Sequence, residues 1–336
     1  MANASRPRWH DQGSGHFYDA IEVTRTLYGT IELPLHAVIG ARPGPVVGVT
    51  ATVHGDETVP PMMLRTLFQG LDAEDLAGTV CAIPVCNPPA MMAYDRQTPE
   101  QHGKTDLHEV FPGNANGNIT QRLAHAICTE LLDHVDVHID YHCGGSGGRL
   151  QERVDYHAGA EDALKARSLD LARCFGTTMV HENNLAGTAV GYVNGLGRPA
   201  FNAETAGVYL GPRATHYYME AGVEGLRNVM RALEMLPNEP RRGKRQLRYG
   251  ADSRVEVNPS RGGYLESGFE DHLDLGRELQ RGTTLGRLID MWSLEVVEEL
   301  VAPVDGYLFF SRYSGVVDSG TKAFALAAAS GTDRLE

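Results

Sequence analysis

The chain has 336 residues, enough for one large domain and a smaller second one. Its 42% hydrophobic and 22% charged residues are typical of a soluble globular protein. The formal net charge of −13 at pH 7 argues against nucleic-acid binding, which needs a basic footprint, and no apolar run is long enough to span a membrane.

The N-terminal residues 1–20 are polar and glycine-rich, and we expect a loosely held arm there. They include no apolar core of the kind found in secretory leaders. The five cysteines are scattered without metal-finger spacing, which is typical of reduced thiols. We therefore predict a cytoplasmic protein.

The next segment predicts the start of a sheet. Residues 22–39 contain the alternation of a hairpin, with turn residues at Tyr28-Gly29. A β-branched apolar run at 46–53 predicts a buried strand. Pro60 and Pro61 suit the first turn of a helix. Residues 54–59 therefore form the junction between the strand and this helix.

This strand–helix junction contains His54 and Glu57. An imidazole and a carboxylate three residues apart, at the carboxyl edge of a sheet, can converge on one metal ion. Taken alone, the motif is equally well explained by a first-turn acid that the helix dipole favours.

Further along, residues 78–85 predict a second strand, and residues 87–117 a long irregular connection of the kind that is often functional. Residues 119–132 predict a helix, with Asn118 as its N-cap. The strict apolar–polar alternation at 135–142 predicts a strand rather than a helical stripe of histidines. His142 then lies at the same sheet edge as His54.

The sequence from residue 160 onward predicts a boundary between two domains. Helices are expected at 160–175 and 214–236, and a short strand at 200–203 leads into Glu204. A basic, proline-rich break at 237–245 separates a domain of residues 21–240 from a C-terminal all-β domain of residues 246–336. The strands expected in the second domain are 254–257, 263–266, 282–289, 293–300, 306–312 and 315–326.

Several motifs occur in an order that resembles one known family. They are VHGDE at 53–57, CNPPAMMAYDR at 86–96, DLHEVFPG at 106–113, DYHCGG at 140–145 and AETAG at 203–207, with APVDGYL at 302–308 and GVVDSG at 315–320 near the end. This set resembles the succinylglutamate desuccinylase/aspartoacylase family of the zinc carboxypeptidase superfamily. The resemblance implies an α/β fold with a mixed, mainly parallel sheet flanked by helices, followed by a smaller C-terminal β domain.

The resemblance also implies roles for individual residues. His54, Glu57 and His142 would bind one zinc ion per chain, and two imidazoles with a carboxylate and an open position are typical of catalytic zinc. Glu204 would be the catalytic acid–base residue and Arg96 would polarise the scissile carbonyl. Asp106 would orient the first zinc histidine.

The chain departs from the family at one motif. Relatives read D-L-N-R where this chain has Asp106-Leu107-His108-Glu109, so an acid replaces the arginine that would hold a substrate carboxylate. Either another arginine, Arg122 or Arg149, supplies the charge, or the substrate is neutral or cationic there. We therefore take His108 and Glu109 as candidate substrate-binding residues.

We predict a zinc-dependent amidohydrolase that removes a small acyl group from an amine or amino-acid derivative. Its partner would be a small N-acyl substrate, and a homodimer is possible. The alternatives are a carboxypeptidase-type peptidase, which the missing arginine disfavours, and a non-catalytic metal- or ligand-binding protein. Against the latter, the metal ligands, Glu204 and Arg96 are all present.

Overall fold

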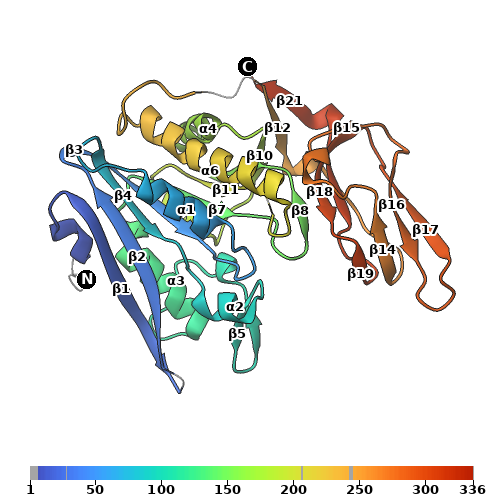
Figure 1. Cartoon of the computed structure of the whole chain (residues 1–336), viewed down its shortest axis with the longest axis horizontal. Coiled ribbons are helices and arrows are strands. Elements are labelled where there is room, and N and C mark those ends of the chain that lie inside the picture. The colour runs from blue at the N-terminus through green and yellow to red at the C-terminus, as the bar shows by residue number, and fades with distance from the viewer. Residues whose placement is uncertain (1–6, 28, 206, 242–244, 336) are drawn as a thin grey trace.

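The computed structural model describes residues 7–27, 29–205, 207–241 and 245–335 (Figure 1). Its centre is a large mixed sheet, and the central strands β4, β3, β7 and β11 are parallel. The carboxyl ends of β3, β7 and β11 therefore lie at one edge of the sheet. The strand order is β1 (Gly15–Thr26), β2 (Gly29–Ile39), β4 (Ala77–Ile83), β3 (Arg42–Ala51), β7 (Val137–His142), β11 (Ala200–Glu204), β9 (Arg153–His157), β10 (Met179–Asn183), β12 (Gln246–Gly250) and β21 (Thr332–Leu335).

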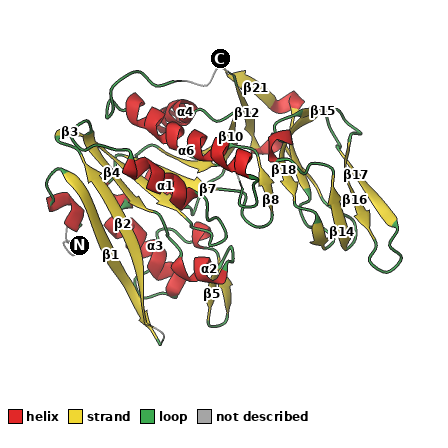
Figure 2. Cartoon of the chain, in the orientation of Figure 1, coloured by secondary structure: helices red, strands yellow, loops and turns green. Residues whose placement is uncertain are grey.

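Helices cover both faces of this sheet (Figures 1 and 2). On one face, α1 (Pro60–Gln69), α4 (Asp162–Phe175) and α6 (Pro212–Ala232) pack onto a shared apolar core. On the other face, α3 (Ile119–Glu130) and α5 (Ala189–Gly195) pack on a second core. The predicted α/β architecture is confirmed.

The helix boundaries follow the chemistry of the sequence. Two prolines occupy the first turn of α1, where their missing N–H groups would have no helical partner. At α3, Asn118 and Gln121 form a reciprocal capping box.

Short 3₁₀ turns occur at η1 (Arg8–Asp11), η2 (Leu107–Glu109), η3 (Leu132–His134), η4 (Ala251–Ser253), η5 (His272–Asp274) and η6 (Ala329–Gly331).

The connection at 87–117, expected to be irregular, contains short elements. They are α2 (Pro88–Ala93), the small hairpin of β5 (Thr98–Glu100) and β6 (Gly103–Thr105), and the 3₁₀ turn η2. Gly55 brings α2 against the end of β3, because a Cβ there would lie 2.0 Å from the carbonyl carbon of Ala90. This contact holds the connection beside the carboxyl edge of the large sheet.

The C-terminal part forms two small sheets around an apolar core of their own. One contains β13 (Arg254–Val257), β20 (Phe324–Ala328), β18 (Gly306–Arg312) and β15 (Glu278–Leu279), with β8 (Gly148–Leu150) paired to β18. The other contains β17 (Val296–Val301), β16 (Thr284–Ile289), β14 (Gly263–Ser267) and β19 (Gly315–Val317). Because β12 and β21 join the large sheet, this part of the chain also extends that sheet. The division at 240–246 stays a prediction.

Two expectations need correction. The single strand expected at 315–326 is two strands, β19 and β20, because a turn closed by the Thr321 N–H on the Asp318 carbonyl lies between them. Residues 8–20 are not a loose arm. Trp9 is 2% exposed and donates its indole N–H to the Glu130 carbonyl, and β1 already begins at Gly15.

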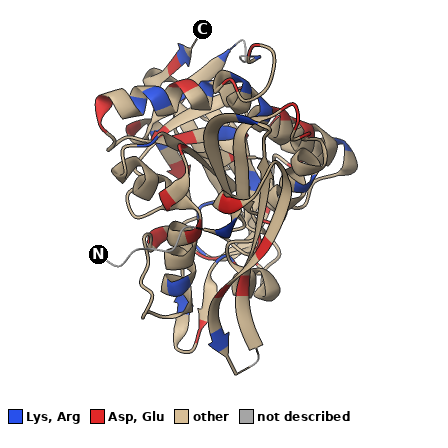
Figure 3. Ribbon diagram, turned by 90° about the vertical axis from the view of Figure 1, so that its left-hand side faces the viewer, with Lys and Arg blue, Asp and Glu red and all other residues tan. Residues whose placement is uncertain are grey.

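Charged residues of both signs are interspersed along the elements, as the view in Figure 3 shows. Among the helices of the described residues, none combines the length and apolarity needed to cross a membrane.

Candidate metal centre and hydrolytic site

Two histidines converge on one carboxylate at the carboxyl edge of the large sheet. His54 Nδ1 lies 2.7 Å from Glu57 Oε1, and His142 Nδ1 lies 3.0 Å from Glu57 Oε2. His54 and Glu57 follow β3, while His142 ends β7, the neighbouring parallel strand. All three side chains are almost fully buried. The structure thus brings together the three residues that the sequence predicted as metal ligands.

Each histidine is fixed on its far side by a second carboxylate. His54 Nε2 lies 3.2 Å from Asp106 Oδ1, and His142 Nε2 lies 3.0 Å from Asp140 Oδ2. If each Nε2 carries the proton and donates it, the Nδ1 lone pairs point toward Glu57. Carboxylates in this position orient metal-bound imidazoles in known sites.

The charges fit a divalent cation. Glu57, Asp106 and Asp140 carry three negative charges, and Arg96 supplies one positive charge through its Nε, 3.2 Å from Asp106 Oδ2. A divalent ion bound at the two Nδ1 atoms would take the place of the protons that these carboxylates favour on His54 and His142. Burial is the largest influence on the pKa of His142 and lowers it, but Asp140 and Glu57 outweigh it and raise the pKa well above its usual value.

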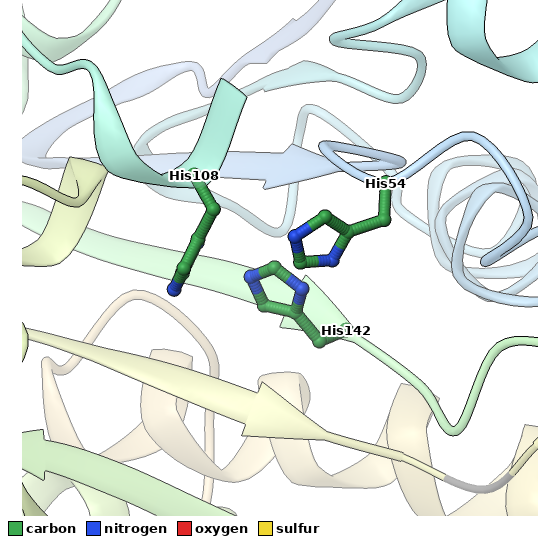
Figure 4. A group of neighbouring side chains, drawn as sticks. All are labelled: His54, His108 and His142. Atoms are coloured by element: carbon green, nitrogen blue, oxygen red, sulfur yellow. The ribbon is translucent and has the colours of Figure 1, made fainter. Parts of the chain in front are cut away.

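A third histidine joins this cluster. His108, on η2, lies with its ring centroid 4.8 Å from that of His142 and 5.4 Å from that of His54 (Figure 4). One ring nitrogen of each histidine lies within 4.8 Å of the others, so the three could also hold a metal. Burial, followed by the charges of the other two histidines, lowers the pKa of His108 to about 3, so its ring is neutral at pH 7.

Glu204 lies at the end of β11, directly across from His142 in the strand register. Burial is the main influence on its pKa and raises it, while the charge of Arg153 acts in the opposite direction. Arg153 Nη2 lies 3.3 Å from Glu204 Oε1. A carboxyl group with a raised pKa suits transfer of a proton near neutrality.

Arg96 lies at the rim of the cluster. Its guanidinium contacts Asp106 and lies 3.8 Å from Glu57 Oε1, and its side chain is 54% exposed. One side of this cation is therefore open to a ligand. Asp106 contacts both Arg96 and His54 and also accepts the backbone N–H of His108, which fixes the start of η2.

Glu109, the other candidate substrate residue, is exposed. Within the described parts of the chain, its carboxylate forms no hydrogen bond or ion pair. Its backbone packs against the loop between β10 and α5, since the carbonyl of Gly187 accepts the N–H of Phe111 and a Cβ on Gly187 would lie 3.3 Å from the backbone oxygen of Glu109. Glu109 is thus free to meet a ligand, but it does not belong to the histidine cluster.

The sequence-based reasoning missed the buried network behind Glu204. Arg153 Nε lies 2.7 Å from Asp155 Oδ1, and His181 Nδ1 lies 3.5 Å from the same oxygen. The charges of Arg153 and His181 outweigh the effect of burial and lower the pKa of Asp155. An available signal was Arg153 and Asp155 alternating with apolar residues in one short strand, since residues two apart share a face.

The chain is similar to several known proteins. Residues 43–233 match the family model of the succinylglutamate desuccinylase/aspartoacylase catalytic domain. An N-alpha-acetyl-L-2,4-diaminobutyric acid deacetylase from Halomonas elongata is 33% identical over 152 residues. That match covers 44% of this chain and 43% of the relative, so it spans less than half of the relative's length.

Solved structures show the same fold. A succinylglutamate desuccinylase/aspartoacylase from Rhodobacter sphaeroides superimposes with a TM-score of 0.80 at 25% identity, covering 94% of this chain and 96% of the other. The product-bound ectoine utilization protein from Ruegeria pomeroyi gives a TM-score of 0.82 at 23% identity, covering 95% and 97%.

Proposed function

The chain belongs to the succinylglutamate desuccinylase/aspartoacylase family, whose members are deacylases, and on that premise we propose that it is a zinc-dependent deacylase of a small N-acyl amine or amino acid. The convergence of His54 Nδ1 and His142 Nδ1 on the carboxylate of Glu57 is the observation that carries this proposal. Two imidazoles and a carboxylate are a ligand set of catalytic zinc, and no cysteine is needed.

His54 and His142 would hold the ion through their Nδ1 atoms, which face Glu57, and Glu57 would hold it through its carboxylate. His108 is the weaker candidate as a ligand, because the Nε2 atoms of the other two histidines are engaged with Asp106 and Asp140. A bound Zn²⁺ acts as a Lewis acid, which lowers the pKa of water and polarises a carbonyl.

The remaining chemistry belongs to residues of the chain. Glu204 would accept a proton from the attacking water and deliver it to the amine nitrogen as the C–N bond breaks. Arg96, with its exposed face, would hold the acyl oxygen while negative charge develops there. The products are a carboxylate and an amine.

The substrate would carry a second amino group or be neutral at the position facing Glu109. The motif places an acid where relatives hold a carboxylate-binding arginine, and the exposed carboxylate is not neutralised within the described chain. A charge-assisted hydrogen bond to an ammonium group would favour a diamino compound. The similarity to a deacetylase of N-acetyl-diaminobutyric acid supports this substrate class.

Metal analysis and kinetics on matched acidic, neutral and basic N-acetyl compounds test the proposal. We expect about one zinc per chain and activity that chelation removes and zinc restores. His142→Ala should lose both zinc and activity, whereas His216→Ala, at an exposed position on α6, should keep both.

Glu204→Gln separates catalysis from metal binding. This variant should keep its zinc while turnover falls by ~10²-fold or more, because an amide cannot accept the proton. Glu74→Gln, at an exposed site, is the matched control. Active protein without metal would refute the metal assignment, and unchanged turnover in Glu204→Gln would remove Glu204 from the mechanism.

A further inference from the structure

Arg149 is a buried cation without an acidic partner among the described residues. It lies on β8, seven residues after His142, in the segment that leaves the metal centre and pairs with β18. The residue is 9% exposed, and its Nη1 atom is buried with no hydrogen-bond partner in the part of the chain that the structure describes. Across the described residues, no ion pair or hydrogen bond involves its side chain. A guanidinium has five N–H donors, so leaving it unpaired in a buried position is costly.

Two tyrosines lie between Arg149 and the loop that follows Glu204. The guanidinium carbon lies 4.3 Å from the ring centroid of Tyr313, which follows β18. Tyr313 packs edge-on against Tyr209, whose backbone N–H points to the Tyr313 hydroxyl at 3.4 Å. A Cβ on Gly207, three residues after Glu204, would lie 3.2 Å from the same hydroxyl. The cation thus lies beside the loop that follows the proposed acid–base residue.

Further contacts link the surroundings of Arg149 to the proposed metal ligands. The backbone N–H of Cys143 donates to Glu57 Oε2 at 3.0 Å. The backbone N–H of Thr205 donates to the His142 carbonyl at 2.9 Å, and a Cβ on Gly207, two residues later, would lie 3.7 Å from the carbonyl oxygen of Gly148. Arg149 therefore lies beside the segments that carry His142 and Glu204.

The other arginine that could compensate for Glu109 is already engaged. Arg122 Nε donates to the Gly117 carbonyl at 2.8 Å, which ties it to the loop before α3. Arg312, the neighbour of Tyr313, donates its Nε to the Lys322 carbonyl at 2.8 Å. Arg149 alone of these three keeps its guanidinium without a hydrogen bond inside the described chain.

We propose that Arg149, stacked on Tyr313, binds the carboxylate of the substrate's amino-acid portion. This inference rests on the proposed deacylase function and narrows its substrate to an N-acyl amino acid, with Glu109 left to contact a second amino group. Because only 9% of Arg149 is exposed, a ligand that reaches it must be small. Its planar guanidinium can donate two parallel hydrogen bonds to a carboxylate.

The test uses two substrates that differ only in the carboxylate: N-α-acetyl-2,4-diaminobutyrate and N-acetyl-1,3-diaminopropane. In Arg149→Met, KM for the first compound should rise ~10- to 100-fold, the factor that corresponds to losing a charge-assisted hydrogen bond. KM for the second compound and kcat for both should stay near wild-type values. Arg149→Lys should be intermediate, because an ammonium keeps the charge without the fork.

Arg122→Met is the matched control and should leave both KM values unchanged. Equal losses on both substrates in Arg149→Met, or an effect of Arg122→Met on the carboxylate substrate alone, would overturn the assignment. If Arg149→Met does not fold, as judged by circular dichroism, the ratio of the two KM values in Arg149→Lys and Arg149→Gln decides the question.

A binding measurement separates this inference from the proposed function. Calorimetric titration of the zinc-loaded protein with 2,4-diaminobutyrate and with 1,3-diaminopropane does not require turnover. Wild type should prefer the amino acid, and Arg149→Met should lose that preference. If neither acetylated compound is hydrolysed but the preference persists, the deacylase proposal fails and the anion site stands; equal binding of both compounds by wild type refutes the anion site.

Discussion

Glu152 is a buried carboxyl group whose ionisation the fold opposes. It lies between β8 and β9, is 5% exposed, and lines a cavity of 190 Å³ beside Thr205 and Tyr217. No cation pairs with it within the described ranges. Burial is the dominant cause that raises its pKa from 4.5 to about 7, and hydrogen bonds from Thr178 and Tyr217 offset this only in part.

This difference in pKa makes stability depend on pH. Below pH 4.5, Glu152 is protonated in both the folded and the unfolded chain and contributes no pH dependence. Between pH 4.5 and 7 the unfolded chain releases the proton first, so the free energy of unfolding falls as pH rises, by about 1.4 kcal/mol per pH unit. The loss reaches about 3 kcal/mol at pH 7 and then stays constant.

Glu152→Gln removes this titration. Relative to wild type, the variant should therefore gain up to about 3 kcal/mol between pH 4.5 and pH 8. Any constant cost of placing the amide in the cavity does not change with pH. Urea unfolding of both proteins, followed by circular dichroism across this range with chelator present, measures the difference.

The control is Glu74→Gln, which removes a carboxylate at an exposed position. A difference in unfolding free energy between wild type and Glu152→Gln that is the same at every pH would refute the reasoning. So would a variant that becomes less stable than wild type as pH rises.

The remaining predictions concern the site. Asp140→Asn should lower metal affinity ~10- to 100-fold in chelator competition, because Asp140 holds His142 Nε2. The control Asp136→Asn, at an exposed position just before the same strand, should leave metal affinity unchanged. Equal affinities of Asp140→Asn and wild type would show that Asp140 does not orient the ligand. Glu109→Arg should raise KM for a basic N-acyl substrate and admit N-acetyl-aspartate-like acids. A wild-type preference for the dicarboxylic acid would contradict the role given to Glu109.

Much of the fold follows from local patterns in the sequence. The β-branched run at 46–53 and the alternation at 135–142 predict β3 and β7, because burial on a sheet face selects these side chains directly. Asn118 marks the start of α3, since capping depends on neighbours within one turn. His54, Glu57 and His142 could be predicted as a group, because each ends or follows a strand at the same sheet edge.

Other features depend on contacts between distant segments, which no local pattern contains. Trp9 is buried because α3 reaches it, and Arg153 meets Glu204 because β9 pairs antiparallel with β11. The sequence alone leaves open whether Arg122 or Arg149 compensates for Glu109. The tertiary structure distinguishes them, since it ties Arg122 to a backbone carbonyl and leaves Arg149 buried against Tyr313, with no ion-pair partner among the residues that the structure describes.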